Sequence, residues 1–92
     1  MIVSFTHKGL ERFFRTGSKA GIQPAHAARL NLMLALLNIA KSAEDMNVPG
    51  FDFHPLKGEL KGYFALKVSG NWRLIFKQTG ENMELLDYLD YH

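Results

Sequence analysis

Residues 62–79 have the sequence GYFALKVSGNWRLIFKQT, and this stretch decides the fold. In its first half the apolar residues Phe64, Leu66 and Val68 alternate with Tyr63 and Lys67 and with small residues. Alternation with a period of two is typical of a half-buried β-strand. The turn Ser69-Gly70-Asn71 separates this half from a second run of strand character. The stretch therefore predicts an antiparallel hairpin.

Three further strands are expected in total, two before this hairpin and one after it. Residues 53–56 precede it, and residues 83–88 follow it after the turn Gly80-Glu81-Asn82. Glycine-containing turns of this kind join successive antiparallel strands. Near the start of the chain, residues 2–5 predict one more short strand.

Two helices are expected between residues 6 and 41. Thr6 provides an N-cap signal for the first helix, and Gly17 provides the signal that ends it. Pro24 suits the first turn of a second helix that runs to Lys41. The second helix is apolar almost all round between residues 32 and 39, so we expect two partners for it: the sheet, and either the first helix or a separate protein. The predicted fold is α+β, in the order β-α-α-β-β-β-β, with both helices on one face of an antiparallel sheet.

Length and composition limit what this protein can be. A chain of 92 residues has room for one modest core, so we expect a single domain over residues 1–92. It contains no cysteine, which agrees with a reducing compartment. We find neither a signal peptide nor an apolar run of about 20 residues, the length that crosses a membrane. These observations predict a cytoplasmic protein without membrane contact.

The formal net charge of +2 hides a segregation of charge along the sequence. Residues 1–30 and residues 53–77 each carry five Lys or Arg against one Glu, whereas residues 78–92 carry four acids and no Lys or Arg. A basic surface attracts phosphate groups. The alternative is that these charges only keep exposed helix and strand faces in water.

The second strand of the hairpin extends the basic pattern to one face of the sheet. Trp72, Leu74 and Phe76 are expected on the core side, which places Arg73 and Lys77 on the opposite face with Lys67 and Ile75. We expect this open face to be basic, partly aromatic and uncovered by helix. A polyanion such as RNA would bind there, and the RNA-binding residues predicted for it are Lys61, Tyr63, Lys67 and Lys77.

The chain also contains the groups that RNA cleavage needs. Cleavage without a metal requires a base for the 2′-hydroxyl proton, cations near the phosphorane and an acid for the leaving 5′-oxygen. The candidates are His54, Lys57, Arg73, Asp90, Tyr91 and His92. We expect no cofactor and no metal site, since no two histidines have the helical spacing of metal ligands. His7 and His26 are expected to be surface groups near helix starts.

Four motifs in order resemble the HigB toxins of the RelE superfamily. They are His54-Pro55-Leu56-Lys57-Gly58, Gly62-Tyr63, Asn71-Trp72-Arg73-Leu74-Ile75-Phe76 and Asp87-Tyr88-Leu89-Asp90-Tyr91-His92. The opening residues 4–10 and the segment 17–24 match the same family, so the resemblance covers essentially the whole chain.

This resemblance implies a toxin of a type II toxin-antitoxin system. Such a toxin is a ribosome-dependent mRNA endoribonuclease, which cuts codons in the decoding site of the 30S subunit within the 70S ribosome. The expected partner is a helix-turn-helix antitoxin of the HigA type, and operator DNA is bound only through the antitoxin complex. All six candidate catalytic residues named above match the family pattern.

Two other classes of function remain open from the sequence. A relative could keep the basic face and bind RNA or the ribosome without cutting. A pure interaction protein could use the apolar second helix to dock a partner helix, with its charges incidental.

Overall fold

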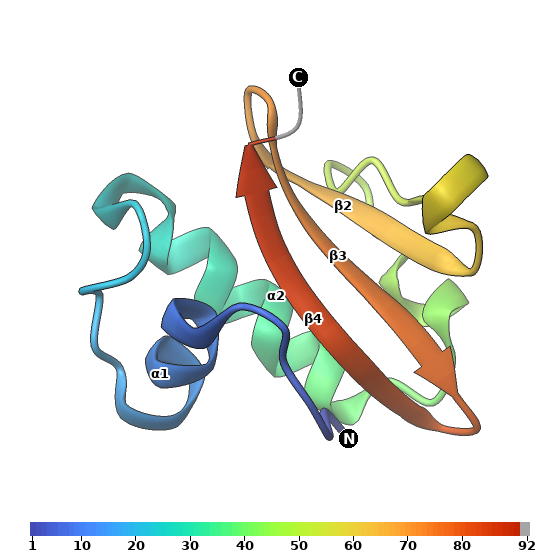
Figure 1. Cartoon of the computed structure of the whole chain (residues 1–92), viewed down its shortest axis with the longest axis horizontal. Coiled ribbons are helices and arrows are strands. Elements are labelled where there is room, and N and C mark those ends of the chain that lie inside the picture. Colours follow the sequence, from blue (N-terminus) through green and yellow to red (C-terminus); the bar gives the residue numbers. More distant parts are fainter. Residues whose placement is uncertain (91–92) are drawn as a thin grey trace.

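Over residues 1–90, which the computed structural model describes, two α-helices pack on one face of a four-stranded antiparallel sheet (Figure 1). The strands follow one another across the sheet in chain order: β1 (His54–Pro55), β2 (Tyr63–Ser69), β3 (Trp72–Thr79) and β4 (Asn82–Asp90). Each strand is thus hydrogen-bonded to its neighbour in sequence, as a series of hairpins requires. The expected α+β class and the expected hairpin are confirmed.

The segment at the start of the chain runs beside β4 without forming a full strand. It makes two isolated parallel bridges, Ile2 with Met83 and Phe5 with Leu86. Between these bridges Leu85 has a φ of 55°, and its main-chain N–H donates to the Ser4 hydroxyl at 2.9 Å. Since a left-handed residue breaks the regular ladder, the strand expected at residues 2–5 is reduced to an edge segment.

The N-cap of helix α1 (Lys8–Thr16) lies one residue later than expected. His7, and not Thr6, is the N-cap, because its ring Nδ1 accepts the main-chain N–H of Leu10 at 2.9 Å. Gly17 ends the helix with a φ of 79°, as expected. A histidine that was expected to be a plain surface group is therefore part of the helix start.

Helix α2 (Ala27–Ile39) follows a single 3-10 turn, η1 (Pro24–His26), close to the expected bounds. One side of α2 is buried, through Ala27, Leu30, Met33, Leu34 and Leu37. The other side stays open, since Leu32 is 52% exposed and Ile39 is 71% exposed. Within residues 1–90, neither helix has the length and apolar character that crossing a bilayer demands.

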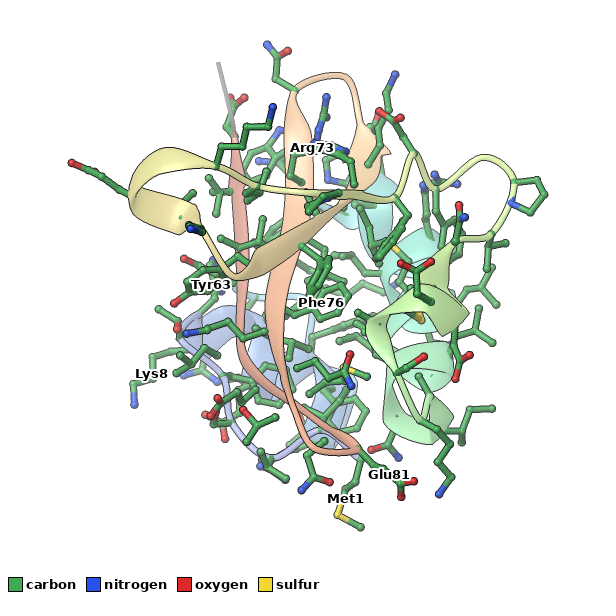
Figure 2. The ribbon with its side chains drawn as sticks, turned by 90° about the vertical axis from the view of Figure 1, so that its right-hand side faces the viewer. Met1, Lys8, Tyr63, Arg73, Phe76 and Glu81 are labelled. Atoms are coloured by element: carbon green, nitrogen blue, oxygen red, sulfur yellow. The ribbon has the colours of Figure 1, made fainter. Side chains whose placement is uncertain are left out.

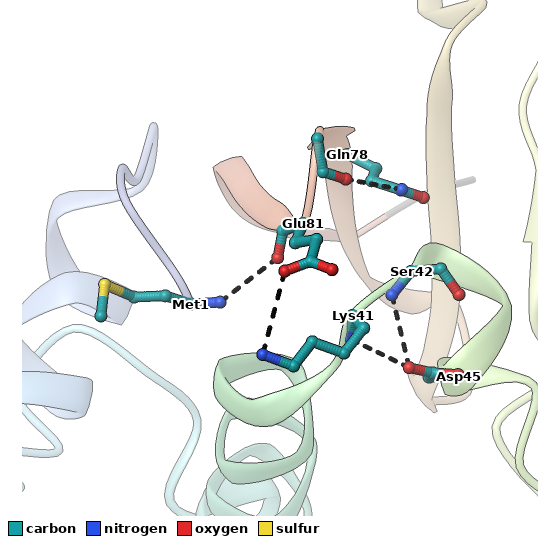
Figure 3. Close-up of polar contacts among 7 residues, drawn as sticks. Met1, Lys41, Ser42, Asp45, Gln78 and Glu81 are labelled. Atoms are coloured by element: carbon teal, nitrogen blue, oxygen red, sulfur yellow. Dashed lines mark hydrogen bonds and ion pairs between the residues drawn. The ribbon is translucent and has the colours of Figure 1, made fainter.

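Polar contacts tie the end of α2 to the turn between β3 and β4 (Figure 3). The Lys41 ammonium lies 4.0 Å from the Glu81 carboxylate, and the Met1 ammonium donates to the Glu81 carbonyl at 3.5 Å. Ser42 and Asp45 form a capping box at the start of the 3-10 helix η2 (Ala43–Met46). These contacts hold the chain start and the end of α2 at the β3–β4 turn, at the end of the molecule away from the β2–β3 turn.

The two faces of the sheet carry two separate apolar clusters. On the helix side Phe76 is fully buried, whereas Tyr63 lies on the other side of the sheet (Figure 2). On that other side Leu56 and Leu60 pack over Ile75, which is only 3% exposed. The 3-10 helix η3 (Gly58–Leu60) belongs to this cover. The expectation of an open face with no helical cover is therefore wrong at its centre, and we keep the name open face for the side of the sheet away from α1 and α2.

Candidate functional site

Two cations lie directly opposite each other on the open face. The register of β2 and β3 pairs Lys67 with Arg73, and the next residue across, on β4, is Leu89. Directly opposed side chains on neighbouring strands have Cβ atoms about 4.5–5.5 Å apart, and two like charges in this arrangement destabilise a sheet. Because the pair lowers the stability of the fold, we expect it to serve a function, and binding of an anionic ligand is the simplest one.

The Arg73 side chain is held at the tip of the hairpin (Figure 2). Its Nη1 donates to the carbonyl of Gly70 at 2.7 Å and to the carbonyl of Trp72 at 3.1 Å. A guanidinium has five N–H donors, so these two bonds orient the group and leave donors for a ligand. Arg73 is half-buried, which fixes its position more firmly than that of a free surface arginine.

His54 reaches the same face from the short edge strand β1. It pairs with Ala65, and it is therefore the diagonal neighbour of Lys67, at a separation of about 7–8 Å in typical sheets. Its ring Nδ1 lies 2.8 Å from the main-chain carbonyl oxygen of Asp52. The site thus brings an imidazole close to the cation pair formed by Lys67 and Arg73.

Lys77 and Tyr63 form a row farther along the open face, beyond the apolar pair Ala65 and Ile75. They are cross-strand partners, and the Lys77 ammonium lies 5.4 Å from the centre of the Tyr63 ring. This distance is within the range of a cation–π contact. On its other side Lys77 is paired with Glu84 of β4, so the positive charge of this row is partly balanced.

Lys57 and Lys61 lie on the connection between β1 and β2. They flank η3, and both side chains are exposed. Because Leu56 and Leu60 anchor this connection to the open face, the two lysines are carried close to the sheet by a packed segment and not by a loose loop.

The described part of the carboxy-terminal motif ends at Asp90. The register pairs Asp90 with Trp72, whose side chain packs with the core on the helix side. Asp90 is therefore on the helix side of the sheet, whereas Arg73 is on the open face. Tyr91 and His92 lie outside the described residues. Among residues 1–90, no three His, Cys, Asp or Glu side chains gather as a metal site needs.

An aromatic cluster that the sequence did not reveal anchors the end of β4. The Tyr88 ring stacks on Trp72 at 4.6 Å, and its hydroxyl oxygen lies 2.7 Å from the His26 ring Nδ1. The same hydroxyl accepts the main-chain N–H of Gln23 at 3.2 Å. Burial raises the pKa of Tyr88, and the hydrogen bond from Gln23 opposes this rise. Since His26 and Tyr88 are 62 residues apart, no local pattern could have indicated their contact.

Comparison with solved structures finds the same fold in another protein. The structure of YafQ from E. coli superposes with a TM-score of 0.58 at 21% identity, covering 96% of this chain and 89% of that chain. At this level of identity the likeness shows a shared fold, with two helices on a four-stranded antiparallel sheet over the described residues.

Sequence comparison identifies the family. Residues 3–92 match the family described as the RelE-like toxin of type II toxin-antitoxin system HigB. Endoribonuclease HigB of Proteus vulgaris is 36% identical over 92 residues, with all of both chains covered. Toxin HigB-1 of Vibrio cholerae serotype O1 is 33% identical over 94 residues, covering 100% of this chain and 98% of that protein. The fold is that of a RelE-like toxin. Within that class, this chain belongs to the HigB family of type II toxin-antitoxin systems, which implies an antitoxin partner.

Proposed function

We propose that this toxin is an endoribonuclease that cuts mRNA codons in the A site of the translating ribosome and thereby inhibits translation. The observation that carries the proposal is the opposition of Lys67 and Arg73 next to His54 on the open face. An unfavourable pair of cations beside an imidazole suits a phosphodiester better than it suits a structural role. The name of the Proteus vulgaris relative as an endoribonuclease supports the same reaction.

The proposed chemistry uses the 2′-hydroxyl of the RNA as the nucleophile and no metal ion. His54 accepts the hydroxyl proton, since the register turns Asp90 to the opposite face of the sheet. Lys57 with Arg73 stabilises the charge that develops on the phosphorane. His92 donates a proton to the leaving 5′-oxygen, while Tyr91 stacks on a base. The products are a 2′,3′-cyclic phosphate and a 5′-hydroxyl.

RNA binding is assigned to the rest of the open face and to the connection that covers its centre. Lys67, Lys77 and Lys61 contact phosphates, and Tyr63 offers a ring surface beside them. Each phosphate contact contributes to affinity and to its dependence on salt.

The proposed partners follow from the family. A helix-turn-helix antitoxin of the HigA type neutralises the toxin, and the complex binds operator DNA through the antitoxin. The toxin acts in the cytoplasm on the 30S decoding site of the 70S ribosome. Leu32 and Ile39 on the exposed side of α2 are apolar surface away from the open face.

A translation reaction with the purified protein tests the proposal. The 5′ ends of the mRNA are mapped by primer extension, with and without ribosomes, for the wild type and for Arg73→Ala and His92→Gln. We expect cuts inside codons only when ribosomes are present, with both variants strongly impaired. Cuts on naked RNA would indicate a free nuclease, whereas binding to ribosomes without cuts would favour the non-catalytic binding module. Undiminished cleavage by His92→Gln would remove His92 from the role of the acid.

A further inference from the structure

The main chain just before His54 is held at three successive carbonyl groups. The Gly50 carbonyl accepts the Arg29 guanidinium at 2.5 Å, and the Phe51 carbonyl accepts the main-chain N–H of Lys67 at 2.7 Å. The third carbonyl, of Asp52, lies 2.8 Å from the His54 ring Nδ1. The histidine is thus attached to a segment that is bonded to both α2 and β2.

Side chains on either side of Asp52 fix the direction of its carbonyl. Phe51 is buried, and the Arg29 guanidinium lies over its ring at 5.3 Å. The Phe53 ring is stacked on Phe64 at 5.4 Å, with 10° between the ring planes. Between these two anchors Asp52 has a φ of 51°, in the left-handed region that aspartate tolerates better than most residues. The left-handed residue turns the chain so that its carbonyl meets the imidazole two residues later.

This contact decides which ring nitrogen of His54 carries a proton. A carbonyl oxygen only accepts hydrogen bonds, so the ring nitrogen that faces it must donate. In the neutral imidazole the proton is therefore on Nδ1, and the lone pair is on Nε2.

We propose that the main-chain carbonyl of Asp52 is a positioning group that holds His54 as the Nδ1–H tautomer and so makes Nε2 the base. This inference rests on the proposed function. In the step concerned, the O–H bond of the 2′-hydroxyl breaks and the proton forms a bond with Nε2. The 2′-oxygen then attacks phosphorus and forms the bond of the 2′,3′-cyclic phosphate. The bond from phosphorus to the 5′-oxygen breaks, and that oxygen keeps the electron pair and takes a proton from the general acid to become the 5′-hydroxyl. Throughout the step Nδ1–H keeps donating to the Asp52 carbonyl, which stabilises the imidazolium that forms.

The tautomer can be measured directly by ¹⁵N NMR of protein labelled at its histidine ring nitrogens. The spectrum of His54→Gln assigns the His54 signals. We expect Nδ1 to have the chemical shift of a protonated ring nitrogen and Nε2 that of an unprotonated one. Protonated Nε2 in the neutral ring of the wild type would overturn the inference.

Substitution of Asp52 tests the link to catalysis. Asp52→Val places a β-branched residue where φ is positive, which strains the turn, whereas asparagine tolerates this conformation and removes only the charge. We expect Asp52→Val to mix the two tautomers and to lower kcat about 10-fold to 100-fold, less than the roughly 10²- to 10⁴-fold that a whole proton-transfer group supplies. Asp52→Asn should restore the Nδ1–H tautomer and most of the lost rate. If Asp52→Val does not fold, Asp52→Ala applies a smaller strain of the same kind.

Asn47→Val is the matched control, because it puts the same side chain at an exposed position with a φ of −79°. It should leave both the tautomer and the rate unchanged. Loss of rate in Asp52→Asn equal to that in Asp52→Val would contradict the inference, since it would give the role to the carboxylate. The failure of the proposed function is recognised separately, as an intact Nδ1–H tautomer in a protein that cleaves no mRNA on ribosomes.

Discussion

Lys67 and Arg73 are directly opposed across β2 and β3, so that two positive charges share one position of the sheet. The arrangement costs stability, because like charges that face each other across a ladder repel. It also concentrates charge where a phosphate can bind. Stability and affinity should therefore change in opposite directions when the charge of Lys67 is removed.

Lys67→Met tests this opposition. The neutral side chain keeps the length of lysine, so we expect the free energy of unfolding to rise by about 0.2–1 kcal/mol. RNA binding should weaken, and the slope of log K against log salt should become shallower by about 0.7 for the lost phosphate contact. Urea unfolding and binding titrations at several salt concentrations measure the two effects. Lys19→Met, which removes an exposed lysine outside the sheet, is the control. A less stable variant with an unchanged salt slope would contradict the idea.

Arg73→Ala should separate catalysis from folding. The loss of one preorganised cation lowers kcat by about 10²- to 10³-fold in comparable sites. The loss of the bonds to Gly70 and Trp72 should cost about 1 kcal/mol of folding stability, the net contribution of a typical hydrogen bond. Ribosome-dependent cleavage rates and urea unfolding are compared with those of Arg12→Ala, which removes an exposed arginine from α1. A variant that loses stability and activity in proportion would indicate a structural role only.

Gly9 and Gly21 form a close contact between α1 and the connection that follows it. A Cβ atom added to Gly21 would lie 2.5 Å from the Cα atom of Gly9, and one added to Gly9 would lie 2.7 Å from the Cα atom of Gly21. Backbone atoms cannot yield as a flexible side chain does. We therefore expect Gly21→Ala to lower the free energy of unfolding by about 1–3 kcal/mol. Ala20→Ser, at the exposed neighbouring position, should change it by less than about 0.5 kcal/mol. Equal thermal stability of the two variants would rule out the close contact.

Tyr88 should make the protein sensitive to alkaline pH. Its pKa is raised in the folded state, so the folded protein holds the phenol proton at pH values where the unfolded chain, with a pKa near 10, has lost it. This contribution to stability is complete below about pH 10 and is lost as the pH rises through the folded pKa. Tyr88→Phe should lose about 1 kcal/mol at pH 7 through its bonds to Gln23 and His26, and it should show a smaller alkaline decline. Urea unfolding at pH 7 to 11 provides the measurement, and an identical decline in both proteins would refute the assignment.

The hairpin and its faces follow from local pattern. Alternation in residues 62–79 is enough to separate Leu66 and Phe76 from Lys67 and Arg73, because each strand has one buried face. The position of Arg73 on the open face could likewise be predicted from strand parity, whereas that of His54 depends on the pairing of β1 with β2. The contribution of the six candidate residues to catalysis remains a prediction.

Other features depend on contacts between distant parts of the chain and have no local signal. Leu85 has a left-handed conformation at an irregularity of the β3–β4 register, and its main-chain N–H bonds to Ser4, 81 residues away in sequence. The cover of Ile75 by Leu56 and Leu60 depends on how one connection folds back on the sheet. Asp52 carries a weak signal, since aspartate is among the residues enriched at positive φ, but only the fold shows that its carbonyl meets His54.

The bond between the Met1 ammonium and Glu81 has a practical consequence for handling the protein. It places the chain start at the β3–β4 turn, whereas the end of β4 pairs with Trp72 beside the β2–β3 turn (Figure 1). An affinity tag or a fluorophore joined before Met1 would be attached at the end of the molecule that lies away from Arg73, which we call the far pole. Surface immobilisation through that pole would present the cation pair to RNA.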